Sequence, residues 1–84
     1  MRVRVLVFGE LSTRLGWSLD VEMGEAPTIR GLLKLLSDRA GASIRVDGGV
    51  TVLVNGRNVN LLGGLDTELR DGDLVVLLPP LSGG

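Results

Sequence analysis

The sequence predicts an α+β domain in which one amphipathic helix covers one face of a small mixed sheet. Three observations support this architecture. Residues 17–23 alternate between apolar and polar side chains, which is typical of an antiparallel edge strand with one face in water. Residues 28–41 carry apolar side chains at helical spacing. The other apolar runs are short and separated by turn residues, which indicates further strands.

The N-terminal half is expected to contain two strands and the helix. Residues 2–8 are rich in valine and predict the first strand, and a turn-like stretch follows. The second strand covers residues 17–23 and has one apolar face, formed by Trp17, Leu19, Val21 and Met23. Thr28 is expected to cap the helix, and Gly41 is expected to end it. The apolar face of this helix consists of Ile29, Leu32, Leu33, Leu36 and Ala40.

The C-terminal half is expected to add the remaining strands. Residues 50–54 predict a third strand, and Asn55-Gly56 is a strong signal for a tight hairpin into a short fourth strand. A weakly patterned segment, 61–69, comes next. Asp-Gly-Asp at 71–73 then predicts a turn into the last strand, residues 74–78.

The last strand is apolar at every position. A single helix can cover only one face of the sheet, so one face of this strand is expected to point outward. That face is either Val75 and Leu77 or Leu74, Val76 and Leu78. An apolar surface there would suit docking of a partner, unless segment 61–69 covers it.

The sequence ends in a thin segment, Pro-Pro-Leu-Ser-Gly-Gly at 79–84. The prolines stiffen the chain as it leaves the last strand, and glycine allows another backbone to approach closely. Six extended residues reach about 20 Å, which is enough to place the carboxylate of Gly84 in a partner's active site. We expect a domain at 1–78 and a tail at 79–84 that carries the reactive group. An inert tail is the alternative.

The composition argues against an independent enzyme. The chain has no Cys and no His, which excludes thiolate or imidazole metal sites, a Cys nucleophile and a Ser-His triad. We therefore expect no bound cofactor and no metal. The net charge of −1 and the scarcity of aromatic residues predict no direct binding to nucleic acid. Without a membrane-spanning run or a signal-peptide pattern, a cytoplasmic protein is expected, with no membrane contact.

The predicted element order, Val-Asn-Gly at 54–56, Asp-Gly-Asp at 71–73 and the ending at 79–84 resemble the small subunit of molybdopterin synthase. That family consists of sulfur carriers of the ubiquitin-like β-grasp superfamily. The resemblance covers essentially the whole chain. It implies a β-grasp fold, a mixed sheet of four to five strands with one helix packed across one face.

The resemblance also implies a chemistry. An E1-like adenylyltransferase would use ATP to adenylate the Gly84 carboxylate. A persulfide sulfur would then displace AMP, which leaves a thiocarboxylate on Gly84, next to Gly83. The large subunit of molybdopterin synthase, in a heterotetramer, would receive the tail and pass the sulfur to a pterin precursor of the molybdenum cofactor. The partners would supply every acid and base. The implied partner interface consists of Phe8, Leu77, Pro79, Pro80, Leu81 and Ser82, although Leu77 fits the core equally well.

Other readings of the same ending stay open. A tRNA-thiolation carrier or a ubiquitin-like protein modifier would use the same activated Gly-Gly end, with a tRNA-thiolation enzyme or target proteins as partners. Thiazole-synthesis carriers tend to be shorter and lack the Pro-Pro pair. Lys34 is the only lysine in the chain and is therefore a candidate self-modification site. The last alternative is a non-catalytic interaction module with a β-grasp body.

Overall fold

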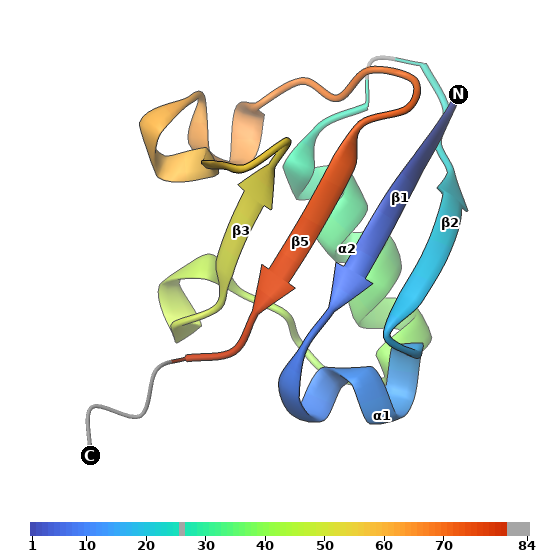
Figure 1. The fold of residues 1–84 in the computed structure, drawn as a ribbon, viewed down its shortest axis with the longest axis vertical. Helices are drawn as coiled ribbons and strands as arrows, with labels where there is room; N and C mark the ends of the chain where they lie inside the picture. The colour runs from blue at the N-terminus through green and yellow to red at the C-terminus, as the bar shows by residue number, and fades with distance from the viewer. Residues whose placement is uncertain (26, 81–84) are drawn as a thin grey trace.

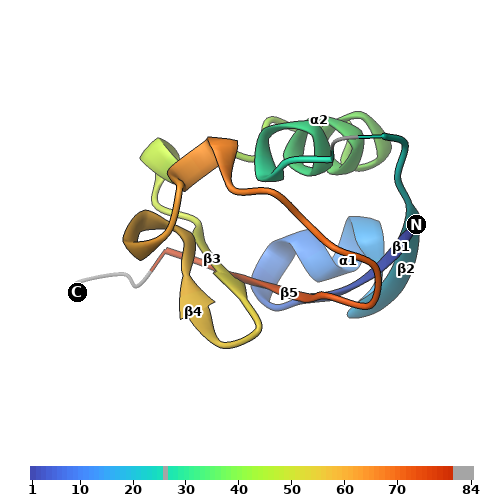
Figure 2. The same ribbon diagram turned by 90° about the horizontal axis from the view of Figure 1, so that it is seen from above.

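The computed structural model describes residues 1–25 and 27–80, which form two layers. One layer is a five-stranded sheet in the order β2-β1-β5-β3-β4, and the other is helix α2, which lies across one face of it (Figure 1; Figure 2). The strands are β1 at Arg2–Val7, β2 at Ser18–Glu22, β3 at Thr51–Val54, β4 at Arg57–Asn58 and β5 at Leu74–Leu78. β1 and β5 pair in parallel and the other neighbours pair antiparallel. The predicted mixed sheet with one helix across it is confirmed.

Helix α2, Ile29–Ala40, begins and ends where its capping residues predicted. The Thr28 hydroxyl accepts a hydrogen bond from the Gly31 N–H at 3.2 Å, and Gly41 adopts a left-handed φ of 65° directly after the helix. All five residues of the predicted apolar face are buried against the sheet. Within the described part of the chain, no helix combines the length and apolar character needed to cross a membrane.

Gly31 is a position where a substitution should stabilise the protein. A Cβ at Gly31 would meet only the Thr28 hydroxyl, at 3.7 Å, which is ordinary contact. Gly31→Ala should therefore raise the free energy of unfolding by about 0.5–1 kcal/mol, because alanine loses less backbone entropy in a helix. Urea unfolding measures this. Gly41→Ala is the control and should destabilise the protein, because the left-handed φ of Gly41 strains an alanine. Equal effects of the two changes would contradict the assignment of Gly31 to the helix interior and of Gly41 to the cap.

Strand β2 is the antiparallel edge strand that the alternating pattern predicted. Val21 and Met23 are buried on its inner side. The expectation that Trp17 shares this face is wrong, because Trp17 lies in a bend before β2 and is 73% exposed. Gly16, with a φ of 83°, turns the chain there, and Leu15 packs against the core at this end. Leu15 belongs to helix α1, Ser12–Leu15, which follows a 3₁₀ turn at Gly9–Leu11.

Strand β5 occupies the centre of the sheet, between β1 and β3. The hairpin at Asn55-Gly56 forms as predicted, with φ values of 50° and 84°. Asn55 also fixes the start of β5, because its side chain donates to Asp73 at 2.9 Å and accepts from the N–H of Leu74 at 3.0 Å.

Further 3₁₀ turns lie at Val46–Gly48, Val59–Leu61 and Gly64–Asp66. The turn at Gly64–Asp66 packs beside α2. This segment therefore does not cover the face of the sheet opposite α2 (Figure 2).

Candidate functional site

The alternation of burial along β5 shows which face of the sheet is open. Val75 and Leu77 are fully buried beneath α2, whereas Leu74, Val76 and Leu78 point to the other side and are partly exposed. The inner face therefore belongs to the core. The outer face of the central strand stays accessible, in agreement with the expectation that one apolar face points outward.

Leu77 is a core residue, and its assignment to the partner interface is wrong. Its exposed fraction is 0%. Leu77→Ala should lower the free energy of unfolding by about 2–5 kcal/mol, because it removes buried methyl groups and leaves a cavity. The neighbouring Leu78→Ala, on the outer face, should cost about 1 kcal/mol or less. Urea unfolding of the two variants tests the assignment of faces, and equal losses would contradict it.

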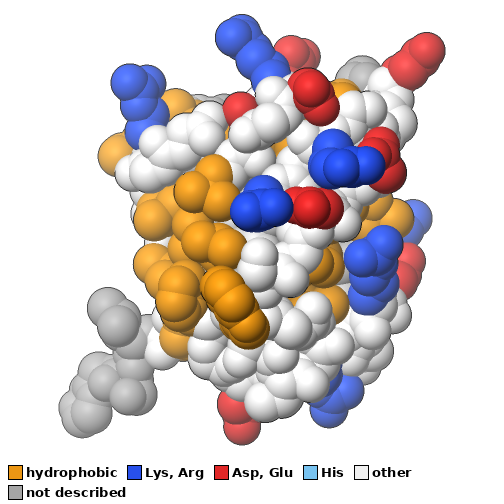
Figure 3. Space-filling model, turned by 45° about the vertical axis from the view of Figure 1, so that its right-hand side comes forward, with side chains coloured by type: hydrophobic (Ala, Val, Ile, Leu, Met, Phe, Trp, Pro, Cys, Tyr) orange, Lys and Arg blue, Asp and Glu red, His pale blue; other side chains and the backbone are white. Residues whose placement is uncertain are grey.

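Outward-facing apolar side chains of three neighbouring strands form one patch. Leu6 of β1 and Leu53 of β3 flank Val76 in one cross-strand row. Phe8 follows two residues after Leu6 in extended backbone and lies on the same face. We call this surface the open-face patch; it consists of Leu6, Phe8, Leu53, Val76 and Leu78. Figure 3 shows hydrophobic side chains gathered in a band on one part of the molecule, with charged side chains beside it.

Ion pairs occupy the other part of the open face, along β1 and β2. Arg2 Nε donates to Glu22 at 3.0 Å, and Arg4 Nε donates to Asp20 at 3.1 Å. The hydrogen bond from Arg4 lowers the pKa of the Asp20 carboxyl, and the same bond raises the pKa of Arg4. These side chains are exposed, so the pairs add little to stability. Their effect is to give the open-face patch a charged border.

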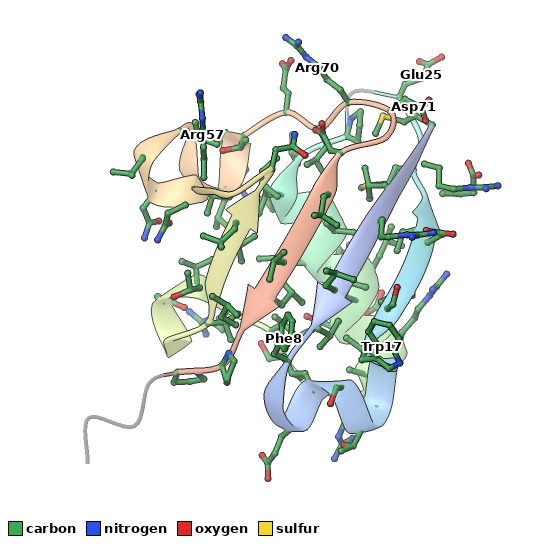
Figure 4. The ribbon with its side chains drawn as sticks, viewed as in Figure 1. Phe8, Trp17, Glu25, Arg57, Arg70 and Asp71 are labelled. Atoms are coloured by element: carbon green, nitrogen blue, oxygen red, sulfur yellow. The ribbon has the colours of Figure 1, made fainter. Side chains whose placement is uncertain are left out.

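The open-face patch reaches the point where the chain leaves β5. The N–H of Phe8 donates to the carbonyl of Leu77 at 3.1 Å and so holds Phe8 beside the end of this strand. Figure 4 shows Phe8 at the lower ends of β1 and β5, whereas Trp17 lies at the lower end of β2. Pro79 and Pro80 follow and are exposed. The structure thus brings together three residues of the predicted interface, Phe8, Pro79 and Pro80.

Four of the predicted site residues lie outside the described residues: Leu81, Ser82, Gly83 and Gly84. Their roles stay predictions, as does the division into a domain at 1–78 and a tail at 79–84. β5 does end at Leu78, where that division was expected.

Lys34 lies away from the open-face patch. It is exposed on α2, which covers the opposite face of the sheet, and it lines a groove of about 600 Å³. Arg30 and Arg45 line the same groove, but Arg30 pairs with Asp66 and Arg45 pairs with Asp47. These pairs offset most of the positive charge, so the groove has no strong preference for an anion. Self-modification at Lys34 stays a prediction.

Sequence reasoning missed Leu6 and Leu53 as surface residues of the site. A signal for Leu6 was present, because the outward positions of β1 are Arg2, Arg4 and Leu6, and only the last is apolar. Leu6 by itself indicates little, because single exposed apolar residues are common; it becomes informative only together with its apolar neighbours on β3 and β5. Leu53 could be found only from the pairing of β3 with β5.

The fold and the site define a class of protein. A mixed sheet with the parallel pair β1 and β5 at its centre and one helix across it is the ubiquitin-like β-grasp fold. The open face carries an apolar patch where the chain leaves the sheet. An exposed apolar surface of this kind is typical of a site that binds another protein.

Comparisons with known proteins agree with this class and give the family. The model of the ThiS family matches residues 5–84, and the chain therefore belongs to the ThiS family. A protein of Archaeoglobus fulgidus named "Putative sulfur carrier protein" is 38% identical over 74 residues, covering 77% of this chain and 84% of the relative. "Small archaeal modifier protein 3" of Haloferax volcanii is 38% identical over 71 residues, covering 81% of this chain and 77% of the relative.

A solved structure from Pyrococcus furiosus has the same fold. It is described as "Putative molybdopterin converting factor, subunit 1" and superposes with a TM-score of 0.79 at 28% identity. The superposition covers 96% of this chain and 99% of that structure. The relatives therefore include a sulfur carrier, a protein modifier and a subunit of a converting factor, and the family is one of sulfur carriers and ubiquitin-like modifiers.

Proposed function

We propose that this chain is a sulfur carrier whose Gly84 carboxylate is adenylated and converted to a thiocarboxylate. One observation carries the proposal: the family model matches residues 5–84, a range that includes Gly83 and Gly84. The relative from Archaeoglobus fulgidus, named as a sulfur carrier, supports the same reading. The chain would bind no cofactor itself, and an E1-like adenylyltransferase would consume the ATP.

The proposed chemistry takes place at the carbonyl carbon of Gly84. A carboxylate oxygen attacks the α-phosphorus of ATP and releases pyrophosphate, which gives an acyl adenylate. A sulfide sulfur then attacks the carbonyl carbon, AMP leaves and a thiocarboxylate remains. With a persulfide donor, a thiol must also cleave the acyl disulfide that forms first. Gly83 and Gly84 suit these steps because they have no side chain to obstruct the attacking groups.

We propose that molybdopterin formation is the use of this sulfur. The structural likeness to a molybdopterin converting factor subunit favours it. The sulfur acceptor would be a pterin precursor held by the large synthase subunit, in a heterotetramer. The open-face patch would bind this subunit and the E1-like enzyme in turn, because one apolar surface beside the tail suits both.

A protein modifier is the second candidate. The 38% sequence identity with a small archaeal modifier protein favours it. The same acyl adenylate would then pass, directly or through a thioester, to the amine of a lysine on a target protein. Self-conjugation of this kind could use Lys34, the only lysine in the chain.

Radioactive sulfur distinguishes these fates. The chain is incubated with ATP, the E1-like enzyme of the host and a labelled sulfur donor, and is then chased with cell extract. We expect label on the chain and then in a pterin product. Label that moves into tRNA or a thiazole would overturn the proposed pterin acceptor but would still support the sulfur-carrier function. Release of AMP without label on the chain, together with conjugates on other proteins, would favour the modifier.

A further inference from the structure

Gly9 contacts Pro79 on one side of the point where the chain leaves β5. β1 and β5 are parallel with Val7 opposite Leu77, and the continued register places Gly9 beside Pro79. A Cβ added to Gly9 would lie 2.9 Å from Cβ of Pro79 and 3.0 Å from its Cγ. Such short contacts force the neighbour to move, so only glycine leaves room for the ring. The φ of Gly9, 80°, also favours glycine.

Gly49 contacts Pro80 on the other side. β3 and β5 are antiparallel with Thr51 opposite Leu78, and the continued register places Gly49 beside Pro80. A Cβ added to Gly49 would lie 3.0 Å from Cβ of Pro80 and 3.1 Å from its Cγ. Gly49 has a φ of 98° and follows the 3₁₀ turn at Val46–Gly48. We call the two contacts, Gly9 with Pro79 and Gly49 with Pro80, the glycine notches.

The glycine notches lie where β5 loses its backbone N–H donors. Proline has no N–H, so neither Pro79 nor Pro80 can donate to β1 or β3. Their positions therefore depend on packing and on the fixed φ of each ring. Because one notch lies on the β1 side and the other on the β3 side, together they restrict displacement of the chain in both directions within the sheet.

We propose that Gly9 and Gly49 are positioning residues for the reactive end of this chain. By seating Pro79 and Pro80, they fix the direction of the chain at Pro80, and this direction would govern the approach of Gly84 to an activating enzyme. The functional part of this inference rests on the proposed adenylation of Gly84. A displacement of about 1 Å at the reacting atoms can cost about 100-fold in rate, so small changes at the notches matter.

A spin label tests the notches without any partner enzyme. The chain has no cysteine, so a nitroxide on the Ser82→Cys variant marks a single site. Line broadening of backbone amides in the NMR spectrum then reports which part of the domain the label approaches. We expect Gly9→Ala and Gly49→Ala each to change the pattern of broadening. The same pattern as in the parent would overturn the proposal.

Two other glycines provide matched controls. Gly16 and Gly56 have φ values of 83° and 84°, so alanine is strained there as it is at the notches, but an added Cβ would meet no atom within 4 Å. Gly16→Ala and Gly56→Ala should therefore retain the parent pattern in the spin-label experiment. If these controls change the pattern as well, general strain explains the effect and the proposal fails.

The rate of adenylation shows whether the notches matter for function. At equal fractions of folded protein, Gly9→Ala and Gly49→Ala should lower kcat/KM with the E1-like enzyme about 10-fold or more, and the controls less than about 2-fold. Adding Pro79→Gly removes the ring and its Cβ. In that background Gly9→Ala should cause no further loss of kcat/KM. A purely structural defect at Gly9 would lower kcat/KM whether or not the ring of Pro79 is present.

The two experiments separate failure of the inference from failure of the proposed function. A parent chain that is never adenylated would refute the proposed function, while the spin label would still decide whether the notches direct the chain. A changed broadening pattern with unchanged kcat/KM would overturn the claim that the notches position the chain for activation.

Discussion

Deletion of Gly84 is expected to abolish formation of the thiocarboxylate. The shortened chain still ends in a carboxylate, but that carboxylate lies about 3.3–3.6 Å short of its place along an extended chain. Proximity effects are lost over much smaller displacements, so the rate of adenylation should fall by several orders of magnitude, below detection. Pyrophosphate release with the E1-like enzyme measures the first step, and intact mass measures the product.

The control for this deletion is Ser82→Ala, which keeps the length of the chain and both glycines. It should retain activation. The deletion should also leave the melting temperature unchanged, because the buried residues in the described part of the chain all lie before Pro79. Normal activation of the shortened chain would show that adenylation does not depend on Gly84 and would contradict its assignment as the reacting residue.

Phe8→Asp is expected to produce the second largest loss of activation. Phe8 is the one phenylalanine of the chain; it is 50% exposed on the open-face patch and lies beside the end of β5. Burying a carboxylate in an apolar interface without a partner is costly, and aromatic anchors of interfaces are worth about 2 kcal/mol or more. The kcat/KM of activation should therefore fall about 30-fold or more, mainly through KM.

Trp17→Asp is the matched control for this change. Trp17 is the only other aromatic residue of the chain, is 73% exposed and lies at the lower end of the edge strand β2, outside the open-face patch (Figure 4). The same substitution there should change kcat/KM less than about 2-fold. Phe8→Leu, which keeps an apolar side chain, should recover most of the activity. Equal losses for Phe8→Asp and Trp17→Asp would remove the open-face patch as the docking surface.

The parts of the fold that could be predicted depend on local patterns. The spacing of apolar residues in α2 and its caps at Thr28 and Gly41 lie within one continuous segment, and so does the hairpin at Asn55-Gly56. Each local preference agrees with the final structure, as expected for sequences that fold to one state. The resemblance to a sulfur-carrier family added the fold, which the sheet order confirms.

The faces of β5 and the position of Trp17 could not be predicted in this way. Every residue of β5 is apolar, so its own pattern does not show that Leu77 is core and Val76 is surface. That choice follows from register with β1 and β3. Trp17 fits the alternation of β2, but the bend after Gly16 takes it out of the strand.

The candidate site was predicted only in part, because it joins segments that are far apart in the sequence. Phe8, Pro79 and Pro80 were expected on the basis of the resemblance, and the structure brings them together. The notch glycines, Gly9 and Gly49, were not expected. Each contacts a proline whose approach depends on the complete sheet, so no local pattern could identify them.

The central claim is that the Gly84 carboxylate becomes a thiocarboxylate, and the intact mass of the chain tests it most directly. The purified chain is incubated with ATP, a sulfide source and the E1-like enzyme of its host, and its mass is compared with that of the chain lacking Gly84. We predict a gain equal to the exchange of one oxygen for one sulfur in the full chain and no gain in the shortened one. An unchanged mass in the presence of an active E1-like enzyme would contradict the sulfur-carrier function.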